Sequence, residues 1–376
     1  MEHKADLKDI AKLFLKLGII GFGGPAAHIA MMQNEVVVKR KWLTEEHFLD
    51  LIGATNLIPG PNSTEIAIHI GNEKGGWKGL IVAGLCFISP AVFITGIFAY
   101  FYKQYGQIPA VQPFFYGITP AIIAVILGAI FPLTKKSLKP TELIIIGLLV
   151  LLGSLWSVNE IFLMFGAGFL ALILAYLKNR KQNKISSFLP LTLLQIANTS
   201  IVSASNTNLF WIFLKIGSIL YGSGYVLFAF LDTDLVATGL LTRQQLIDAI
   251  AVGQFTPGPV FSSVTFIGYQ INGVIGAMVS TIAIFLPSFV FVALLNPMVK
   301  IMRNSKLFSS FLDAVNVASV AIIVATCFEM GKETIIDWKT ILISVSSIVI
   351  VFGYKKLNSA FVVIGGSLVG YLLTLI

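Results

Sequence analysis

Residues 56–65 read NLIPGPNSTE and residues 254–263 read QFTPGPVFSS, so the same Pro-Gly-Pro triplet interrupts two separate apolar regions. Proline has no N–H to donate and its ring clashes with the preceding helical turn, so each triplet ends one helix and starts another. Nonhelical backbone persists at membrane depth only where protein or a water-filled cavity surrounds it. Matching breaks in the two halves of an apolar chain therefore indicate a transporter with its substrate site at the breaks.

The composition predicts an all-α polytopic membrane protein. Of the 376 residues, 56% are hydrophobic and 12% are charged, and the mean hydropathy is +0.87. Uncharged runs such as 143–155 and 282–295 approach the length of about 20 residues that a membrane span needs. The net charge of +8 comes largely from short basic loops, which indicates membrane topology and excludes a nucleic-acid partner.

The chain is a tandem repeat. Phe14–Gly18 (FLKLG) matches Phe213–Gly217 (FLKIG), and Pro90 matches Pro287. We therefore divide the chain into a first repeat at 1–177, a basic linker at 178–207 and a second repeat at 208–376. The N-terminus lacks the pattern of a cleaved signal peptide, so we expect it to stay on the mature protein.

Each repeat contains six apolar segments, near 11–34, 47–70, 79–102, 111–132, 141–157 and 160–177, then near 208–230, 245–267, 274–297, 308–329, 340–354 and 358–376. If every segment crosses the membrane, the chain has 12 spans in two parallel repeats. If the two Pro-Gly-Pro segments are re-entrant, about 10 transmembrane helices remain and the repeats have inverted topology.

The distribution of Lys and Arg favours the inverted arrangement. It places on the cytoplasmic side Lys39, Arg40, Lys41, Lys74, Lys78, Lys135, Lys136, Lys139, the linker, Lys300, Arg303, Lys306, Lys355 and Lys356. This arrangement predicts that both chain termini lie outside and that the linker is cytoplasmic.

The helix breaks supply the candidate substrate site. First-turn N–H groups lack intrahelical partners and lie at the positive end of the helix dipole, which suits an anion. The alternative interpretation is a purely structural kink. Candidate substrate-binding residues at the two breaks are Asn56, Pro59, Gly60, Pro61, Asn62, Ser63, Gln254, Pro257, Gly258, Pro259 and Ser262.

Two glycine-rich breaks and two lysines extend this candidate site. Glycines at Gly23, Gly24 and Gly222, with Pro25, can bring backbone amides close to a ligand, or can simply allow close helix packing. Lys16 and Lys215 occupy equivalent positions within the apolar segments. Two such ammonium groups can balance a bound dianion, or can extend to the membrane interface as anchors.

Three further side chains are candidates for proton coupling. Glu65 and His69 are four residues apart, on one helix face after the first break, and His28 follows Pro25. A carboxylate and an imidazole inside a membrane can relay protons, or can form an ordinary satisfied polar contact. No metal site or cofactor is predicted, and Cys86 and Cys327 are interpreted as packing residues. An enzyme is not expected, because zinc-protease and serine-nucleophile patterns are missing from the sequence.

Several ordered motifs resemble the chromate ion transporter family in its long, two-domain branch. In the first repeat they are Phe22-Gly23-Gly24-Pro25, Trp42-Leu43-Thr44 and Pro59-Gly60-Pro61-Asn62; in the second they are Gly253 to Pro259, Phe266 to Tyr269 and Phe285 to Phe289. The resemblance covers nearly the whole chain. It implies a multi-pass protein of the bacterial inner membrane that exports chromate from the cytoplasm, coupled to protons.

The predicted mechanism is alternating access by two inverted repeats around the broken helices. Two alternatives remain open at this stage. Sulfate has the same shape and charge as chromate, and the same amides can line an anion channel. The expected partners are the oxyanion and the lipid bilayer. Whether the protein forms a homodimer is left open by the sequence.

Overall fold

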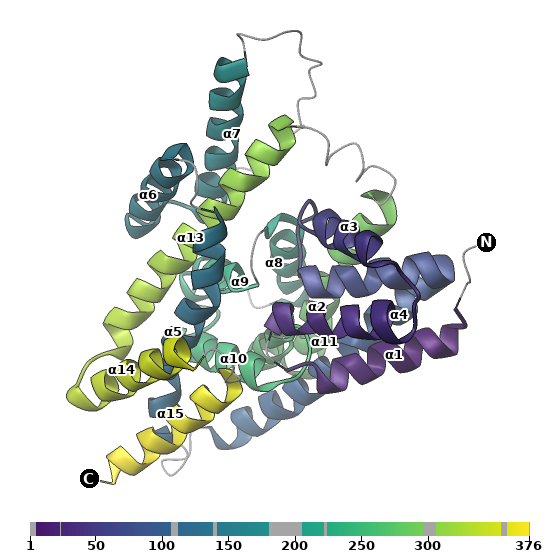
Figure 1. Cartoon of the computed structure of the whole chain (residues 1–376). Coiled ribbons are helices and arrows are strands. Elements are labelled where there is room, and N and C mark those ends of the chain that lie inside the picture. Colours follow the sequence, from purple (N-terminus) through teal and green to yellow (C-terminus); the bar gives the residue numbers. More distant parts are fainter. Residues whose placement is uncertain are drawn as a thin grey trace.

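The computed structural model describes residues 5–22, 24–106, 112–137, 141–179, 205–221, 224–295, 306–354 and 359–375. Over these residues the chain is helical, without strands, as the composition predicts (Figure 1). The first repeat contains α1 (Leu7–Ile20), α2 (Gly24–Gln33), α3 (Glu45–Thr55), α4 (Asn62–Tyr105), α5 (Gln112–Ser137), α6 (Thr141–Leu155) and α7 (Glu160–Asn179). The second contains α8 (Asn206–Ile219), α9 (Val226–Leu231), α10 (Arg243–Phe255), α11 (Ser263–Leu295), α13 (Lys306–Thr334), α14 (Trp338–Gly353) and α15 (Ser359–Thr374). Short helical segments are η1 (Asn34–Lys39), η2 (Asp232–Val236) and η3 (Val260–Ser262).

Helices α4 and α11 are hairpins rather than straight rods. Gly76 has φ 60° and ψ −153°, and Gly273 has φ 61° and ψ −150°. Both helices therefore turn sharply, at equivalent glycines. The legs pack closely because they meet at glycines: Gly71 lies against the Gly79 carbonyl, and Gly268 lies against the Gly276 carbonyl. Each hairpin therefore has a short first leg, which follows the Pro-Gly-Pro turn, and a longer second leg.

The second leg of α4 places the two hairpin turns at opposite ends of the molecule. Near its start, Gly84 packs against the Phe289 ring, far from the turn of α11. Near its end, the Ala99 carbonyl accepts a hydrogen bond of 2.9 Å from Gln270 Nε2, beside the Gly273 turn. Gly76 and Gly273 consequently lie at opposite ends of this leg.

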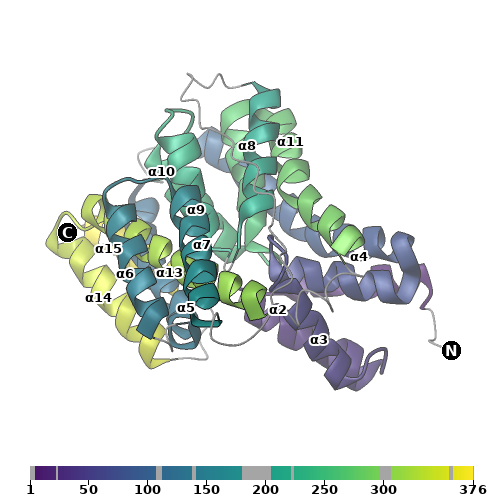
Figure 2. The same cartoon turned by 90° about the horizontal axis from the view of Figure 1, so that it is seen from above.

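The remaining helices pack crosswise between the two halves of the chain. Helix α5 packs against α14 and α15, while its counterpart α13 packs against α6 and α7 (Figure 2). Helices α5 and α13 also contact each other, as do α4 and α11. The two halves are thus interleaved around a shared core rather than joined as separate domains.

Two further hairpins precede the second leg of α4. His47 Nε2 lies 2.7 Å from Glu73 Oε1, so α3 and the first leg of α4 run side by side on either side of the Pro-Gly-Pro turn. Lys16 Nζ lies 2.8 Å from Glu35 Oε1, whereas 19 residues of continuous helix would span about 28 Å. The predicted span at 11–34 is therefore not one straight helix, because α2 and η1 fold back along α1 after the glycine break.

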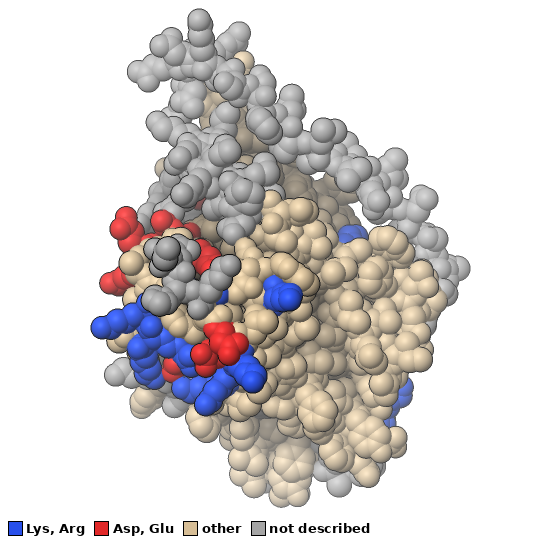
Figure 3. Space-filling view, turned by 90° about the vertical axis from the view of Figure 1, so that its right-hand side faces the viewer, with Lys and Arg blue, Asp and Glu red and all other residues tan. Residues whose placement is uncertain are grey.

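The N-terminus lies at the same end as the first hairpin turn. The Ala5 N–H donates a hydrogen bond of 3.0 Å to the Lys74 carbonyl, and exposed lysines at this end include Lys8, Lys39, Lys41 and Lys78. Figure 3 shows Lys and Arg side chains, with some Asp and Glu, gathered on one part of the face that is turned to the viewer. The prediction that the N-terminus lies opposite Lys74 is therefore wrong, because α1 does not cross in a single span.

Five helical stretches in the described part of the chain are long and apolar enough to cross a membrane. They are Asn62–Tyr105, Pro113–Phe131, Glu160–Leu177, Val260–Leu294 and Phe308–Thr334. Three shorter apolar helices are Thr141–Leu155, Trp338–Gly353 and Ser359–Thr374. Exposed apolar side chains such as Trp156, Phe93 and Leu294 suit a lipid-facing surface.

Candidate functional site

Each Pro-Gly-Pro turn is hydrogen-bonded to the glycine-rich break of the other repeat. The Gly60 N–H donates to the Leu220 carbonyl at 2.8 Å, and the Gly258 N–H donates to the Gly21 carbonyl at 2.7 Å. Positive φ angles of 140° at Gly60 and 94° at Gly258 explain why glycine stands between the prolines. The four breaks predicted from the sequence therefore meet in two crossed pairs within the core.

The Gly60 turn is packed against a buried carboxyl group. A Cβ atom at Gly60 would overlap Glu65 Oε1 and would lie 2.5 Å from Ser288 Oγ. Ser288 Oγ donates to Glu65 Oε1 at 3.4 Å, which links the first leg of α4 to α11. Glu65 is fully buried, its Oε2 atom has no hydrogen-bond partner, and no ion pair to it forms among the described residues. This carboxyl group is therefore enclosed without a compensating cation.

The Gly258 turn has different neighbours. A Cβ atom at Gly258 would lie 2.9 Å from the Ala91 methyl group. Ala91 is the counterpart of Ser288, which lies against the Gly60 turn. The fully buried Thr95 donates to Ser262 at 3.4 Å, and the Ser263 hydroxyl is buried without a partner. Ser263 stands where the first repeat has Glu65. One half of the site therefore carries an acid, and the other half carries only neutral hydroxyl groups.

His28 joins the two crossed pairs. Its Nε2 atom lies 2.8 Å from the Gly21 carbonyl, and its Nδ1 atom lies 3.3 Å from Ser63 Oγ. A carbonyl oxygen only accepts, so Nε2 carries the proton; in the neutral ring, Nδ1 then accepts from the Ser63 hydroxyl. His28 thus connects the glycine break to the first turn of α4. His69, one turn beyond Glu65, is fully buried and neither ring nitrogen has a partner.

Both predicted lysines form ion pairs with acids 19 residues further along the chain. Lys16 pairs with Glu35 at 2.8 Å, and Lys215 pairs with Asp234 at 2.7 Å. The Lys16 and Lys39 ammonium groups hold the pKa of Glu35 down at about 2, so this carboxylate stays ionised throughout the physiological range. In this form neither lysine is the unpaired counter-charge that the sequence analysis predicts.

The other predicted site residues are placed around the breaks. Asn62 Nδ2 donates to Asn56 Oδ1 at 2.9 Å, so these two amides bridge the first Pro-Gly-Pro turn. Gln254 accepts from Tyr225 and from Ser359, both at 3.4 Å. Gly24 has φ 78° and Pro25 lies in the first turn of α2. Gly23, Gly222 and most of the 178–207 linker lie outside the described residues.

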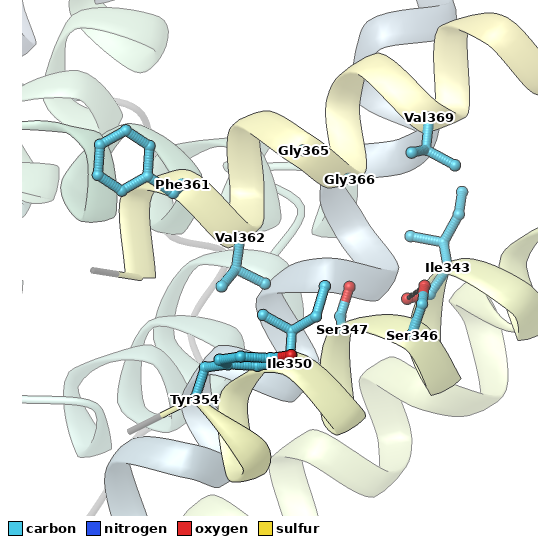
Figure 4. A pocket seen from close by; sticks show the side chains of 10 residues that line it. All are labelled: Ile343, Ser346, Ser347, Ile350, Tyr354, Phe361, Val362, Gly365, Gly366 and Val369. Atoms are coloured by element: carbon cyan, nitrogen blue, oxygen red, sulfur yellow. Dashed lines mark hydrogen bonds between the residues drawn. The ribbon is translucent and has the colours of Figure 1, made fainter. Parts of the chain in front are cut away.

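In the described ranges, the breaks coincide neither with a metal-binding cluster nor with the cavity between α14 and α15. Across the described ranges, no group of three or more His, Cys, Asp or Glu side chains could hold a metal ion. A cavity of about 370 Å³ lies instead between α14 and α15, and its lining includes Ser347, Tyr354 and Phe361 (Figure 4). This cavity is lined by the two outer helices, and its lining contains none of the candidate site residues.

The long apolar helices and the crossed breaks at their centre define a multi-pass membrane transporter. The Chromate transporter family model matches the chain twice, at residues 8–172 and 207–371. The chain belongs to this family, in its long form with two copies, as the sequence motifs predict. Members of the family are transporters rather than enzymes.

Two relatives of similar length and one shorter relative come from different bacteria. A probable chromate transport protein of Synechococcus elongatus is 29% identical, over 97% of this chain and 95% of the relative. A chromate transport protein of Cupriavidus metallidurans is 30% identical, over 97% of this chain and 92% of the relative. An uncharacterized transporter of Bacillus subtilis matches 41% of this chain with 89% of its own length, at 26% identity. No solved structure matches the chain.

Proposed function

We propose that this protein exports chromate from the bacterial cytoplasm across the inner membrane, by alternating access around the crossed breaks. The observation that carries the proposal is the pair of hydrogen bonds from Gly60 to Leu220 and from Gly258 to Gly21. They bring the turns that precede α4 and α11 into contact with the opposite repeat. The choice of chromate as the substrate rests on relatives of similar length that are named as chromate transport proteins.

The chemistry of the breaks suits a tetrahedral dianion. Chromate has four acceptor oxygens, and the first-turn amides of α4 and α11 are donors at positive helix ends. Ser63, Ser262 and Ser263 add buried hydroxyl donors beside these turns. Sulfate offers the same acceptors in the same geometry, so it is the alternative substrate for this site.

We further propose that the two repeats are inverted, with the lysine-rich end of Figure 3 in the cytoplasm. The opposite positions of the Gly76 and Gly273 turns along α4 support inversion. In this arrangement, α3 and the first leg of α4 form a re-entrant hairpin from the cytoplasmic face. The N-terminus lies on that face, while the C-terminal helix ends near the start of α5, where Tyr371 stacks on Phe114.

Matched cysteines beside the two hairpin turns test this topology. Trp77 and Val274 are equivalent positions and both are exposed, by 68% and 62%. In a chain whose Cys86 and Cys327 are replaced, we expect an impermeant maleimide added outside intact cells to label Val274→Cys. Trp77→Cys should react only after the membrane is permeabilised. Labelling of both positions from the same side would contradict inverted repeats.

Glu65 is the group we assign to proton coupling among the three candidates. His28 has both nitrogens in hydrogen bonds, whereas Glu65 and His69 have buried atoms without partners. A dehydrated carboxylate with no cation is strongly disfavoured, so the enclosed Glu65 holds a proton. When the site opens to water the proton can leave, which links proton release to the alternation of the site. His69, one turn away, is the candidate relay.

Transport in membrane vesicles tests the proposed function. We expect everted vesicles to accumulate labelled chromate, and an imposed pH gradient to drive that accumulation. Preloading with unlabelled chromate should accelerate exchange, because a carrier returns faster when loaded. Unsaturable flux without counterflow would indicate the anion channel instead, and accumulation of sulfate alone would reassign the substrate.

The Lys215–Asp234 ion pair is testable by paired substitution. Lys215→Gln leaves Asp234 uncompensated, and we expect a loss of about 1 kcal/mol of stability for this partly exposed pair, with a lower transport rate. Adding Asp234→Asn should restore most of that rate if the pair only holds α8 against η2. The exposed Lys332–Glu329 pair is the control, and its neutralisation should have no effect. A double variant that stays inactive in the membrane would show that the Lys215 charge serves the anion.

A further inference from the structure

Helices α3 and α10 lead into the two Pro-Gly-Pro turns, and we call them the first arm and the second arm. The two arms are packed differently. Helix α10 packs against α5 and α15, and α9 packs against α13, so the second arm is enclosed by helices of both repeats. Helix α3, the counterpart of α10, has its main contact with α4, and it stands at the edge of the molecule in Figure 2. Among the described residues the second arm is thus enclosed, or closed, and the first arm is packed mainly against α4.

A buried carboxyl group fastens the closed arm. Asp248 of α10 is 1% exposed, and its Oδ2 atom accepts a hydrogen bond of 2.6 Å from the Tyr102 hydroxyl of α4. Its Oδ1 atom accepts from Gln244 at 3.0 Å, and Gln244 also donates to Thr119 of α5 at 3.4 Å. Tyr102 is fixed in turn by edge contacts with Phe115 and Phe266. Asp248 therefore joins the second arm to two helices of the first repeat.

The charged groups around Asp248 are engaged elsewhere. Arg243, at the start of α10, pairs with Asp232 of η2 and with Glu333 of α13, while Asp234 of η2 pairs with Lys215. Lys103 of α4 is directed at the Gln270 carbonyl and at the Tyr269 ring of α11.

Other packed elements bring no charge to Asp248. On α5, Tyr116 donates to Asp337, and the two lysines of this helix belong to its far end. On α15, Tyr371 stacks on Phe114, while α9 and η3 contain no titratable residue. Among the described residues no cation forms an ion pair with Asp248, so closure of the arm encloses this carboxyl group with neutral donors only.

The equivalent acid of the first repeat is less buried. Asp50 of α3 aligns with Asp248 and is only half-buried, on the arm that is packed mainly against α4. Burial of an ionised carboxylate without a cation is unfavourable, while burial of the neutral acid is not. Closure of the second arm over Asp248 is therefore favoured when this acid is neutral.

We propose that Asp248 is a proton-binding latch, which closes the second arm when it is protonated and releases it when it is ionised. This inference rests on the proposed alternating access, and it assigns to Asp50 the same task on the other arm. It adds a second acid to Glu65, placed at the entrance of the site rather than at its centre. Acid on the face of the second arm then favours the form described here, in which α10 is closed.

The latch is tested by the accessibility of α10 in the purified full-length protein, in detergent and without any oxyanion. The probe is a single cysteine at Ala251, which is 1% exposed in the closed arm, with Cys86 and Cys327 replaced. Its rate of reaction with a maleimide is divided at each pH by the rate at the exposed Thr238→Cys. We expect the normalised rate to rise several-fold from mildly acidic to mildly basic pH.

Two variants separate the latch from a general effect of pH. Asp248→Asn keeps a neutral hydrogen-bonding group, so the rate should stay low and flat across the range. Tyr102→Phe removes a donor that holds the arm, so its rate should be raised at every pH. Glu329→Gln, at an exposed acid that pairs with Lys332, is the control and should leave the parental profile unchanged.

The proposal is overturned if the parental profile is flat, or if Asp248→Asn shows the same rise as the parent. Since no substrate is present, either result is independent of whether the vesicle experiments support chromate export.

Discussion

Glu65→Gln is expected to abolish the stimulation of transport by a pH gradient, reducing accumulation in vesicles to the level seen without a gradient. The amide is nearly isosteric, and its carbonyl can still accept from Ser288 Oγ, which contacts Glu65 Oε1 at 3.4 Å. Glutamine therefore imitates the permanently protonated acid, and the enclosed form should assemble normally. What it removes is the ability to release a proton once the site opens to water.

Exchange transport should survive this substitution. Counterflow of labelled against unlabelled chromate needs only the alternation of the loaded site, so Glu65→Gln should retain it while losing net gradient-driven flux. Glu73→Gln is the matched control, because Glu73 is on the same leg of α4 but pairs with His47 at its outer end. Full gradient stimulation in Glu65→Gln would remove Glu65 from the coupling mechanism and direct attention to His69 or His28.

The positions of the breaks were predictable because their cause is local. Proline and glycine chemistry acts within a few residues, so the sequence alone assigns Pro59 to Pro61 and Pro257 to Pro259 as helix ends. The glycine turns at Gly76 and Gly273 were visible only as aligned glycines. Their positive φ depends on two helix legs meeting in space, which a single sequence does not encode in readable form.

The ion pairs of Lys16 and Lys215 illustrate where a local interpretation fails. An isolated lysine in an apolar segment indicates a buried charge only if the chain does not fold back after the glycine break. Because α2 folds back along α1, Glu35 reaches Lys16, and the same geometry brings Asp234 to Lys215. The equal separation of 19 residues in both repeats was a signal that could have revealed the pairs.

Ser288 and Asp248 were missed for a different reason. Ser288 approaches Glu65 from the other repeat, and Asp248 meets Tyr102 across 146 residues of sequence. Such contacts follow from the crosswise packing of the two halves, in which α5 is covered by α14 and α15. The repeat alignment did contain one hint, since Asp50 and Asp248 are equivalent acids in otherwise apolar segments. The charge count likewise placed the N-terminus opposite Lys74, although Ala5 is hydrogen-bonded to Lys74, because it treated 11–34 as one crossing.

Gly60→Ala is expected to eliminate transport and to lower the amount of folded protein, with the largest loss of stability of any single methyl addition at the breaks. With φ of 140°, Gly60 occupies a region that is essentially restricted to glycine, at a cost of about 1–3 kcal/mol for alanine. The added methyl would also overlap Glu65 Oε1 and Ser288 Oγ, and such overpacking costs typically about 1–3 kcal/mol more.

Gly76→Ala separates the backbone effect from the contact at the site, because Gly76 also has positive φ but a methyl group added there would meet nothing within 4 Å. It should lose about 1–3 kcal/mol of stability and keep most of its transport. Thermal unfolding of the purified variants and chromate efflux at equal membrane levels measure the two effects separately. If Gly60→Ala and Gly76→Ala lost the same stability and the same efflux, the close approach of Gly60, Glu65 and Ser288 would not be needed for transport. The larger loss at Gly60 is expected because that methyl group enters the contact through which the two repeats hold the acid.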